Sequence, residues 1–357
     1  MRVLVVNAGS SSLKLRLVGA DDELLGARDL EPGGDIAGAL ADLGDADASG
    51  HRVVHGGARF VDPVVIDDGV VGALEKLTAL APLHQPPALA ALAALRRAAP
   101  DLPAVACFDT AFHAGMPEAA ATYALPRAWR ERWPLRRYGF HGLSHAWAAR
   151  RAAELLDGPE RIVVCHLGAG ASLAAVRDGR SVDTTMGFTP LEGLVMATRS
   201  GDVDPGLLMW LLEQPGLSRS EVARALVQDS GLEGLAGTAD MREVLAAAAR
   251  GEPAAILGLD VYVHRLRAAI AAMAAALGGL DALVFTGRVG ERAPQVRARA
   301  AERLGFLGIA LDDSANTAAT TDAEIGAPDA PARTLVIESR EDLEIARSVR
   351  AALGEIR

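Results

Sequence analysis

The sequence predicts an α/β protein built from two related halves. Short apolar runs that are typical of buried strands alternate with longer segments whose apolar residues recur at helical spacing. In addition, RIVVCHLGAGASLAAV at 161–176 repeats the plan of the opening MRVLVVNAGSSSLKLRLV: an apolar strand, a polar residue, a glycine turn with small residues and a second strand. The alternation indicates the fold class, and the repeat indicates an internal duplication.

The pattern places six strands and six helices that frame the rest of the interpretation. The strands are expected at 3–6, 53–54, 104–108, 162–165, 282–285 and 335–337. The helices are expected at 89–98, 144–156, 219–227, 254–277, 295–304 and 341–353. The segment 315–333 is rich in Ala, Thr, Asp and Pro, and we expect an exposed loop or hairpin there.

Composition excludes several classes of protein. Half of the 357 residues are hydrophobic and the net charge is -10, which argues against general nucleic-acid binding. The two cysteines, Cys107 and Cys165, lie in apolar runs and suit a reducing, cytoplasmic compartment. No secretion signal is recognisable. The most apolar stretch, 266–285, contains Arg267 and Asp281 and predicts a buried helix followed by a strand, not a membrane span.

Both glycine turns join two strands, which separates them from the best-known nucleotide loops. Neither reads GxxxxGK[ST] and neither opens a helix, so the Walker and Rossmann patterns are absent. A hairpin turn of Gly and Ser can still hold phosphate, because small side chains let backbone N–H groups and hydroxyls approach the oxygens. Two such hairpins would grip a phosphate chain from both sides; the alternative is two unrelated tight turns.

Polar stretches follow the expected strands. They read HRVVHGG at 51–57, LHQPP at 83–87, ACFDTAF at 106–112, RRYGFHGLSH at 136–145 and MATRSGDVDP at 196–205. Among them Arg52 and Arg199 are loop arginines that suit an anion site. Asp109 ends an apolar strand, where a carboxylate either caps a helix or orients a cationic partner.

The two histidines of the fourth stretch do not predict a metal centre. His141 and His145 stand four residues apart, a spacing that can hold a metal on a helix. Gly139 and Gly142 argue against a regular helix around His141, and no HExxH motif or cysteine cluster accompanies it. No GxSxG motif is present either. Arginines beside phosphate hairpins instead indicate phosphoryl transfer, which depends on positioning and charge neutralisation.

Eight motifs together closely resemble the acetate kinase family, in the same order and over nearly the whole chain: VNAGSSSLK, HRVVHGG, LAPLH, FDTAFH, RRYGFHGLSH, HLGAGAS, ATRSGDVDP and EDLEIAR. The resemblance implies duplicated actin-like ATPase domains of the ribonuclease H-like fold with a cleft between them, 1–111 plus 343–357 and 112–342. It implies reversible phosphoryl transfer from ATP to acetate, giving acetyl phosphate and ADP, with Mg²⁺ or alternatively Mn²⁺. It also implies a cytoplasmic homodimer.

The resemblance carries roles to positions of this chain. The catalytic residues would be Asp109, His141, Arg199 and Arg52, with the two arginines holding the substrate carboxylate and the transferring phosphoryl oxygens. The acid would be bound by Arg52, Val54, Leu83, Phe140 and Pro190. Asn7 and Glu341 would lie at the metal. The nucleotide would be contacted by Lys14, His166, Leu167, Gly168, Ala169, Gly170, Asp240, Met241, Arg242, Arg288, Val289, Gly290, Glu291 and Arg292.

Departures from the family pattern leave alternatives open. Ala169 replaces an amide in HLGNG, Arg288 replaces a glycine in TAGIGEN, and Glu338-Ser339-Arg340 replaces a Pro-Thr-Asn run. One alternative keeps the fold and acid site but uses pyrophosphate or another nucleotide, or a longer acid such as propionate. Another is a non-catalytic ATP-gated binding module. The short span before Arg52 further predicts a trimmed outer layer of the N-terminal domain.

Overall fold

The computed structural model describes residues 1–9, 12–31, 33–81, 85–320 and 322–354. The chain forms two compact units, and each unit is made of more than one segment of the chain. The first unit contains Met1–Ala114, Phe140–Trp147 and Arg340–Arg357, and the second contains Gly115–Gly139 and Ala148–Ser339. The domain limits expected from the sequence stay a prediction.

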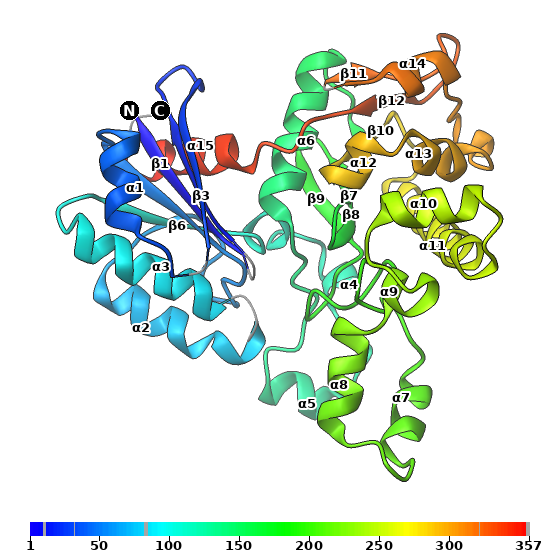
Figure 1. Cartoon of the computed structure of the whole chain (residues 1–357), viewed down its shortest axis with the longest axis horizontal. Helices are drawn as coiled ribbons and strands as arrows, with labels where there is room; N and C mark the ends of the chain where they lie inside the picture. Colours follow the sequence, from blue (N-terminus) through cyan, green and yellow to red (C-terminus); the bar gives the residue numbers. More distant parts are fainter. Residues whose placement is uncertain (10–11, 32, 82–84, 321, 355–357) are drawn as a thin grey trace. The chain divides into compact units, whose positions relative to one another are not determined.

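The first unit is built on a six-stranded mixed sheet in the order β3-β2-β1-β4-β6-β5 (Figure 1). Its strands are β1 (Val3–Ala8), β2 (Leu13–Val18), β3 (Leu24–Leu30), β4 (Ala48–Val53), β5 (Val64–Val65) and β6 (Ala104–Phe108). Strands β1, β2 and β3 form an antiparallel meander, and β4 and β6 run parallel to β1. The short edge strand β5 is antiparallel to β6.

The second unit repeats this plan. Its sheet has the order β11-β12-β10-β7-β8-β9. Its strands are β7 (Arg161–Leu167), β8 (Ala171–Arg177), β9 (Arg180–Thr184), β10 (Ala282–Thr286), β11 (Ala323–Glu324) and β12 (Arg333–Val336). Again the first three form an antiparallel meander, while β10 and β12 run parallel to β7. The duplicated α/β fold of the actin-like, ribonuclease H-like type is therefore confirmed.

Both glycine turns are hairpins, as predicted. The β1–β2 pairing extends to Ala8 opposite Leu13, and the β7–β8 pairing extends to Leu167 opposite Ala171. The segment 315–333 is expected to be an exposed loop or hairpin; its first residues instead belong to helix α14 (Asp313–Ala318). Its remainder contains β11, which pairs with β12 as a hairpin.

Helices cover the sheets, and the six predicted ones are all present within a few residues of their expected limits. Those of the first unit are α1 (Ile36–Leu43), α2 (Asp68–Lys76), α3 (Gln85–Ala98) and α15 (Glu341–Ala352), with 3₁₀ turns at Thr78–Leu80 and Ala111–His113. Helix α6 (Gly142–Leu155) begins in the first unit and ends in the second. The second unit contains α4 (Glu118–Ala121), α5 (Arg127–Arg132), α7 (Pro205–Leu212), α8 (Arg219–Gln228), α9 (Gly231–Ala236), α10 (Met241–Ala249), α11 (Pro253–Leu277), α12 (Gly287–Arg292), α13 (Pro294–Ala301), α14 (Asp313–Ala318) and a 3₁₀ turn at Gly305–Leu307. In the part of the chain that the structure describes, no helix combines the length and apolarity needed to cross a membrane.

The core of the first unit fixes the strand ends that carry polar residues. Helices α1 and α3 pack on one face of β1 and β2 through Leu4, Val6, Leu15, Ala91 and Leu95. Helix α15 packs on the opposite face, against β1, β4 and β6. Close approach there requires glycine, because a Cβ on Gly50 would lie 2.5 Å from Ile345. Strands β1, β4 and β6 thus end at the same edge of the sheet, which is where ligands bind in open α/β sheets.

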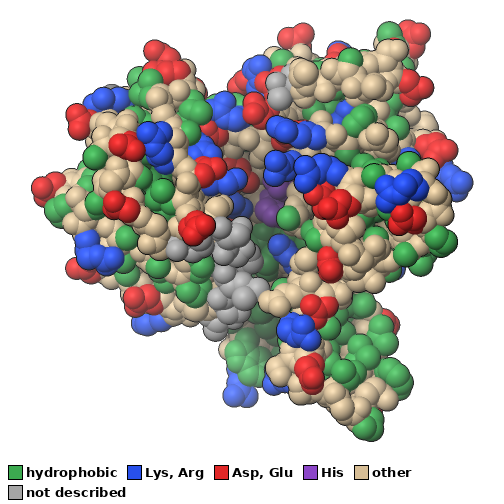
Figure 2. Space-filling view, in the orientation of Figure 1, with side chains coloured by type: hydrophobic (Ala, Val, Ile, Leu, Met, Phe, Trp, Pro, Cys, Tyr) green, Lys and Arg blue, Asp and Glu red, His purple; other side chains and the backbone are tan. Residues whose placement is uncertain are grey.

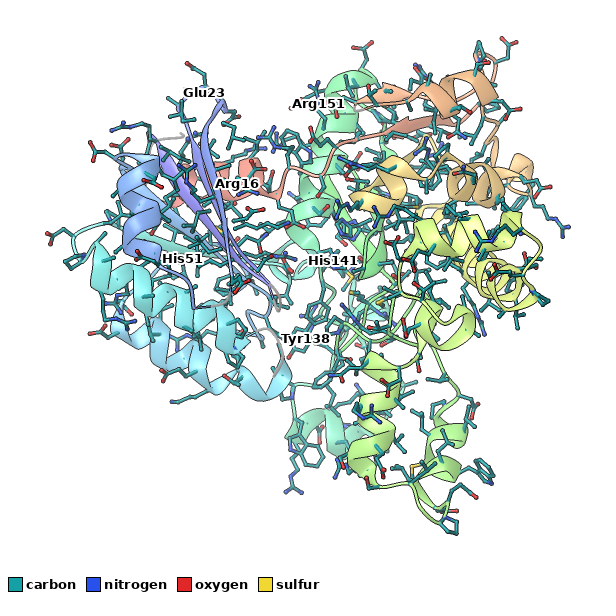
Figure 3. The ribbon with its side chains drawn as sticks, viewed as in Figure 1. Arg16, Glu23, His51, Tyr138, His141 and Arg151 are labelled. Atoms are coloured by element: carbon teal, nitrogen blue, oxygen red, sulfur yellow. The ribbon has the colours of Figure 1, made fainter. Side chains whose placement is uncertain are left out.

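One buried histidine lies inside this sheet. His51 on β4 is 2% exposed, and its Nε2 lies 3.1 Å from the Ser49 hydroxyl (Figure 3). Burial lowers the pKa of His51 to about 4, because the charged ring would lose its hydration. The native protein therefore keeps this ring neutral at neutral pH.

We predict that His51→Gln weakens the pH dependence of stability. The unfolded chain protonates this histidine below about pH 6.5, whereas the native chain does not. The free energy of unfolding therefore falls as the pH drops from about 6.5 towards 4, by up to about 1.4 kcal/mol per pH unit for this residue. In urea unfolding at pH 7 and 4.5, the wild type should lose roughly 2 kcal/mol more than the variant; equal losses would contradict this.

Candidate active site

Four polar side chains meet at the edge of the first sheet. Arg52 and Asn7 lie at the ends of β4 and β1, Asp109 directly follows β6, and Glu341 begins α15. The Arg52 Nε donates to Asp109 Oδ1 at 3.0 Å, and Nη2 donates to Oδ2 at 2.7 Å. The Arg52 Nη1 lies 3.3 Å from Asn7 Oδ1 and 3.2 Å from Glu341 Oε2. These residues are far apart in the sequence, so the sheet assembles the cluster.

The cluster is held together by a buried ion pair. Asp109 is 1% exposed, and the Arg52 side chain is 18% exposed. Burial raises the pKa of the Asp109 carboxyl, and Arg52 opposes that effect. Although burial lowers the pKa of Arg52, attraction to Asp109 and Glu341 raises it overall, so this guanidinium keeps its charge. Of the two interpretations of Asp109, the geometry supports orientation of a cationic partner and not a helix cap.

His141 is placed beside Asp109 by the backbone. It precedes α6 with a φ of 56°, in the left-handed region that residues other than glycine rarely adopt. The next residue, Gly142, donates its N–H to the Asp109 carbonyl at 2.9 Å. A Cβ on Gly142 would lie 2.1 Å from that oxygen, so glycine is required there. The strained backbone at His141 is typical of residues at functional sites.

The residues predicted to bind the acid belong to both units. In the first unit Val54 is 9% exposed and Phe140 is 1% exposed. The Phe140 ring meets the His55 ring edge-on, with 5.5 Å between their centroids. Leu83 lies outside the described residues. In the second unit, Arg199 donates from Nη1 to the Pro190 carbonyl at 2.6 Å, so two predicted site residues are in direct contact. Burial lowers the pKa of Arg199.

Asn7 and Glu341 present oxygens that suit a magnesium ion. The Asn7 amide nitrogen donates to Glu341 Oε2 at 3.2 Å; Asn7 Oδ1 accepts from Arg52, and Glu341 forms an ion pair with Arg52. Within the described ranges, no group of three or more His, Cys, Asp or Glu side chains is arranged to hold a metal. Mg²⁺ commonly uses only one or two protein oxygens and takes its other ligands from phosphates and water. The two residues therefore fit a substrate-bridged ion.

Two segments predicted to contact the nucleotide lie together in the second unit. In the β7–β8 turn, the Gly168 N–H donates to the Gly170 carbonyl at 2.9 Å. Gly287, with a φ of 76°, packs against this hairpin so closely that a Cβ would lie 2.8 Å from the Leu167 carbonyl. Glu291 accepts the Ser339 N–H at 3.0 Å. Thr286 pairs with His166 across β10 and β7, so the hairpin and α12 share one edge of the sheet.

The other predicted nucleotide residues differ in exposure. Asp240 caps α10 and accepts from the Arg242 Nε at 3.0 Å. Hydrogen bonds from Arg242 lower the pKa of Asp240 to about 2, and the charge of Arg288 contributes. Arginine side chains gather on the surface around α12, where Arg288 and Arg292 are exposed (Figure 2). Val289 is half-buried, Gly290 is buried, and the exposed Lys14 lies opposite Asn7 in the β1–β2 ladder. Met241 is 5% exposed, so its side chain belongs to the core.

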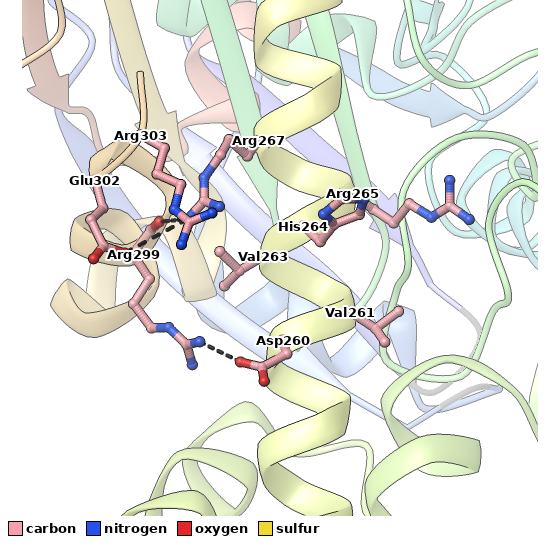
Figure 4. Close-up of a pocket in the computed structure, with 9 residues that line it drawn as sticks. All are labelled: Asp260, Val261, Val263, His264, Arg265, Arg267, Arg299, Glu302 and Arg303. Carbon is pink, nitrogen blue, oxygen red and sulfur yellow. Dashed lines mark hydrogen bonds and ion pairs between the residues drawn. The ribbon is translucent and has the colours of Figure 1, made fainter. Parts of the chain in front are cut away.

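One pocket lies apart from all predicted site residues. It has a volume of about 540 Å³ and lies between α11 and α13 (Figure 4). Two of its arginines already have protein partners: Arg299 pairs with Asp260, and the Arg267 Nη2 donates to the Arg299 carbonyl at 2.6 Å. Arg265 points away from this group (Figure 4). The pocket is therefore not part of the candidate site.

Sequence reasoning missed one group of residues that supports the Arg199 loop. Glu192 bonds to both Tyr123 and Arg137. These residues lie outside helices and strands, and no motif or periodicity around Glu192 indicates a role for it. The polar stretch at 136–145 does include Arg137, which was the one available signal.

The known proteins that resemble this chain over nearly its whole length include acetate kinases and a propionate kinase. A model described as the acetokinase family matches residues 36–347. The acetate kinase of Clavibacter michiganensis subsp. michiganensis is 46% identical over an alignment of 390 positions that covers 98% of each chain. The crystal structure of Porphyromonas gingivalis acetate kinase matches with a TM-score of 0.90 at 34% identity and covers 99% of both chains. A propionate kinase structure from Francisella tularensis subsp. tularensis has a TM-score of 0.90 at 35% identity, covering 97% of this chain and 98% of that one.

We predict that Asp109→Ala lowers the free energy of unfolding by about 3 kcal/mol, because the partly buried Arg52 loses its two-pronged carboxylate and keeps Glu341 as its charged partner. The matched control is Asp42→Ala, which removes the exposed partner of Arg28 in the same unit. That change should cost less than about 1 kcal/mol. Chemical unfolding of both variants measures the difference. A similar loss in the two variants would show that the Arg52–Asp109 pair stabilises the native state no more than an exposed ion pair does.

Proposed function

The chain belongs to the acetokinase family, and on that premise we propose that it is an acetate kinase. It transfers a phosphoryl group from ATP to acetate, giving acetyl phosphate and ADP, and catalyses the reverse reaction. The observation that carries the proposal is the guanidinium of Arg52, oriented by the buried carboxylate of Asp109 at the ligand-binding edge of the first sheet.

The chemistry requires little from a general base. The acetate carboxylate is already ionised at neutral pH, so no proton has to be removed before it attacks phosphorus. The difficulty lies in bringing two anions together and in stabilising charge on the transferring group. Arg52 and Arg199 hold the carboxylate and the phosphoryl oxygens, since a guanidinium fork matches both. His141 donates a hydrogen bond to the same oxygens.

Asp109 acts through Arg52. Its carboxylate accepts from Nε and Nη2 of Arg52, which fixes the plane of the guanidinium. Nη1 is then directed at the oxygens of Asn7 and Glu341. A guanidinium fixed before the substrates bind does not need to reorganise during the reaction, which is the source of electrostatic catalysis.

Glu341 and Asn7 would hold a magnesium ion, or manganese in its place. Bound with ATP, the ion would neutralise phosphate charge. Both oxygens already face a cationic group in this structure, because Asn7 Oδ1 accepts a hydrogen bond from Arg52 and Glu341 Oε2 forms an ion pair with it. A carboxylate and an amide oxygen are hard donors that suit this metal.

The acid and the donor are proposed as acetate and ATP. The acetate kinase relatives support this choice over the alternative donors that Ala169 and Arg288 raised. A structural relative named as a propionate kinase shows why the acid still needs measurement. One methylene is worth only about 1–3 kcal/mol in an apolar pocket, so propionate should be a weaker substrate and not an excluded one.

We further propose a cytoplasmic homodimer. Helix α7 supports a contact surface, because none of its residues is buried although its sequence is PGLLMWLL. Leu207, Met209 and Trp210 are 43%, 62% and 57% exposed. Large apolar side chains gathered on one exposed helix are typical of protein–protein interfaces.

The proposal predicts acetyl hydroxamate formation from acetate, ATP, Mg²⁺ and hydroxylamine. Arg199→Ala should lower kcat/KM for acetate by about 10²-fold or more, because a charge that stabilises the transition state is lost. Arg303→Ala, an exposed arginine in the pocket of Figure 4, is the matched control and should keep wild-type rates.

The same assay decides between donors and acids. ATP, GTP and pyrophosphate are compared at fixed acetate, and acetate is compared with propionate at fixed ATP. Preference for ATP and acetate supports the proposal. A preference for pyrophosphate would replace the donor, and absence of product with every short acid would overturn the function.

A further inference from the structure

We infer that Glu192 is a positioning residue for Arg199, acting with Tyr123 and Arg137; we call these three residues the Glu192 network. The inference rests on the proposed role of Arg199. Arg199 lies in the segment 185–202, which contains no helix or strand. Among the described residues, Arg199 has no carboxylate partner, unlike Arg52. Its side chain donates from Nη1 to the Pro190 carbonyl at 2.6 Å, so the orientation of the guanidinium depends on how this segment is held.

The carboxylate of Glu192 is bound on both sides. One oxygen accepts from the Tyr123 hydroxyl, and the other accepts from Arg137 Nη2 at 2.5 Å. The side chains of Glu192 and Arg137 are 31% and 19% exposed, so the charge-assisted bond is partly shielded from water. Burial and the bond to Glu192 raise the pKa of the Tyr123 hydroxyl, which therefore stays protonated and able to donate.

Both partners of Glu192 also bind the backbone near the start of the segment. The Tyr123 hydroxyl oxygen accepts the Phe188 N–H at 2.8 Å. The Arg137 Nη1 donates to the Thr185 carbonyl at 3.0 Å. The network therefore ties Glu192 to backbone four to seven residues before it.

A glycine makes room for the network. A Cβ on Gly187 would lie 1.6 Å from Glu192 Oε2 and 2.1 Å from the Tyr123 hydroxyl oxygen. The Gly187 carbonyl in turn accepts the Tyr138 N–H at 3.0 Å. The same short stretch of backbone thus holds the carboxylate of Glu192 and the residue that follows Arg137.

Immediately after Glu192, the chain closes a ring that contains Arg199. The Gly193 N–H donates to Asp202 Oδ1 at 2.7 Å, and the Asp202 N–H donates back to the Gly193 carbonyl at 3.0 Å. Glu192 therefore lies between two of the points that hold the Arg199 segment: the Pro190 carbonyl, two residues before Glu192, and the ring closure at Gly193. The backbone near Arg199 is also held by the bond from the Met196 N–H to the Arg199 carbonyl. Loss of the Glu192 charge should release the points at Pro190 and Gly193 at once.

The test is Glu192→Gln, which keeps the size of the side chain and removes its charge. We expect kcat/KM for acetate to fall about 10-fold or more, while KM for ATP changes less than twofold. If Glu192 acts through Arg199, the substitution should have less than a twofold further effect in an Arg199→Ala background. Tyr123→Phe, which removes one hydroxyl, should give a smaller loss in the same direction and serves if Glu192→Gln folds poorly.

The matched control is Glu324→Gln. It makes the same chemical change in the same unit, at an ion pair with Arg333 that lies outside the 185–202 segment. Its kinetic constants should equal those of the wild type. An equal loss from Glu192→Gln with and without Arg199, or a parallel rise in KM for ATP, would overturn the positioning role.

Hydrogen exchange tests the inference separately from the proposed function. Amides in 185–202 should exchange at least fivefold faster in Glu192→Gln than in the wild type, and should not change in Glu324→Gln. Unchanged exchange in Glu192→Gln would overturn the inference even for an active enzyme. A wild-type protein without kinase activity but with the expected exchange difference would overturn the proposed function and retain Glu192 as the support of the Arg199 loop.

Discussion

A guanidinium that is largely removed from water needs carboxylate partners, and in the first unit the sheet and helix α15 supply two of them to Arg52. Arg52 stands at the end of β4, where the sheet places Asp109 on one side and Asn7 and Glu341 on the other. Without those oxygens its charge would be very costly in this position. The returning helix α15 is part of the arrangement, because it supplies Glu341 and packs over Gly50. The proposed function and the stability of this unit therefore involve the same ion pair.

The second unit fixes its arginine differently. Arg199 is bound to a backbone carbonyl and not to a carboxylate, and its loop is held by the Glu192 network and by Asp202. Arg52 keeps carboxylate partners, whereas Arg199 has none among the described residues, which suits its proposed role of binding an anionic ligand. Arg52, which is held by a carboxylate, and Arg199, which is not, together suit the proposed reaction, because that reaction joins two anions.

The sequence predicted the framework because its signals are local. Short apolar runs marked strands such as Ala104–Phe108, and the repeated glycine turns revealed both hairpins and the duplication. Polar residues at strand ends, Arg52 and Asp109, were found for the same reason. Periodicity cannot say that two such residues bond, and the orientation of Arg52 by Asp109 needed the structure.

Other features had no local signal. The left-handed backbone at His141 follows from the hydrogen bond between Gly142 and Asp109, which are 33 positions apart. Helix α14 formed in a segment whose Ala, Thr and Asp content indicated a loop. Glu192 gains its role from Tyr123 and Arg137, 69 and 55 positions away. Contacts between such distant residues depend on the tertiary structure, so residue spacing in the sequence cannot predict them.

We propose that catalysis depends on the geometry of the Arg52 guanidinium, which is fixed by Asp109, and not on its charge alone. Arg52→Lys tests it directly, because lysine keeps the charge but cannot bond to Asp109 and to the Asn7–Glu341 pair at once. The account predicts that kcat for acetyl phosphate formation falls by about 10²-fold or more, with the fold intact by circular dichroism. A lysine variant within a few-fold of the wild type would contradict it.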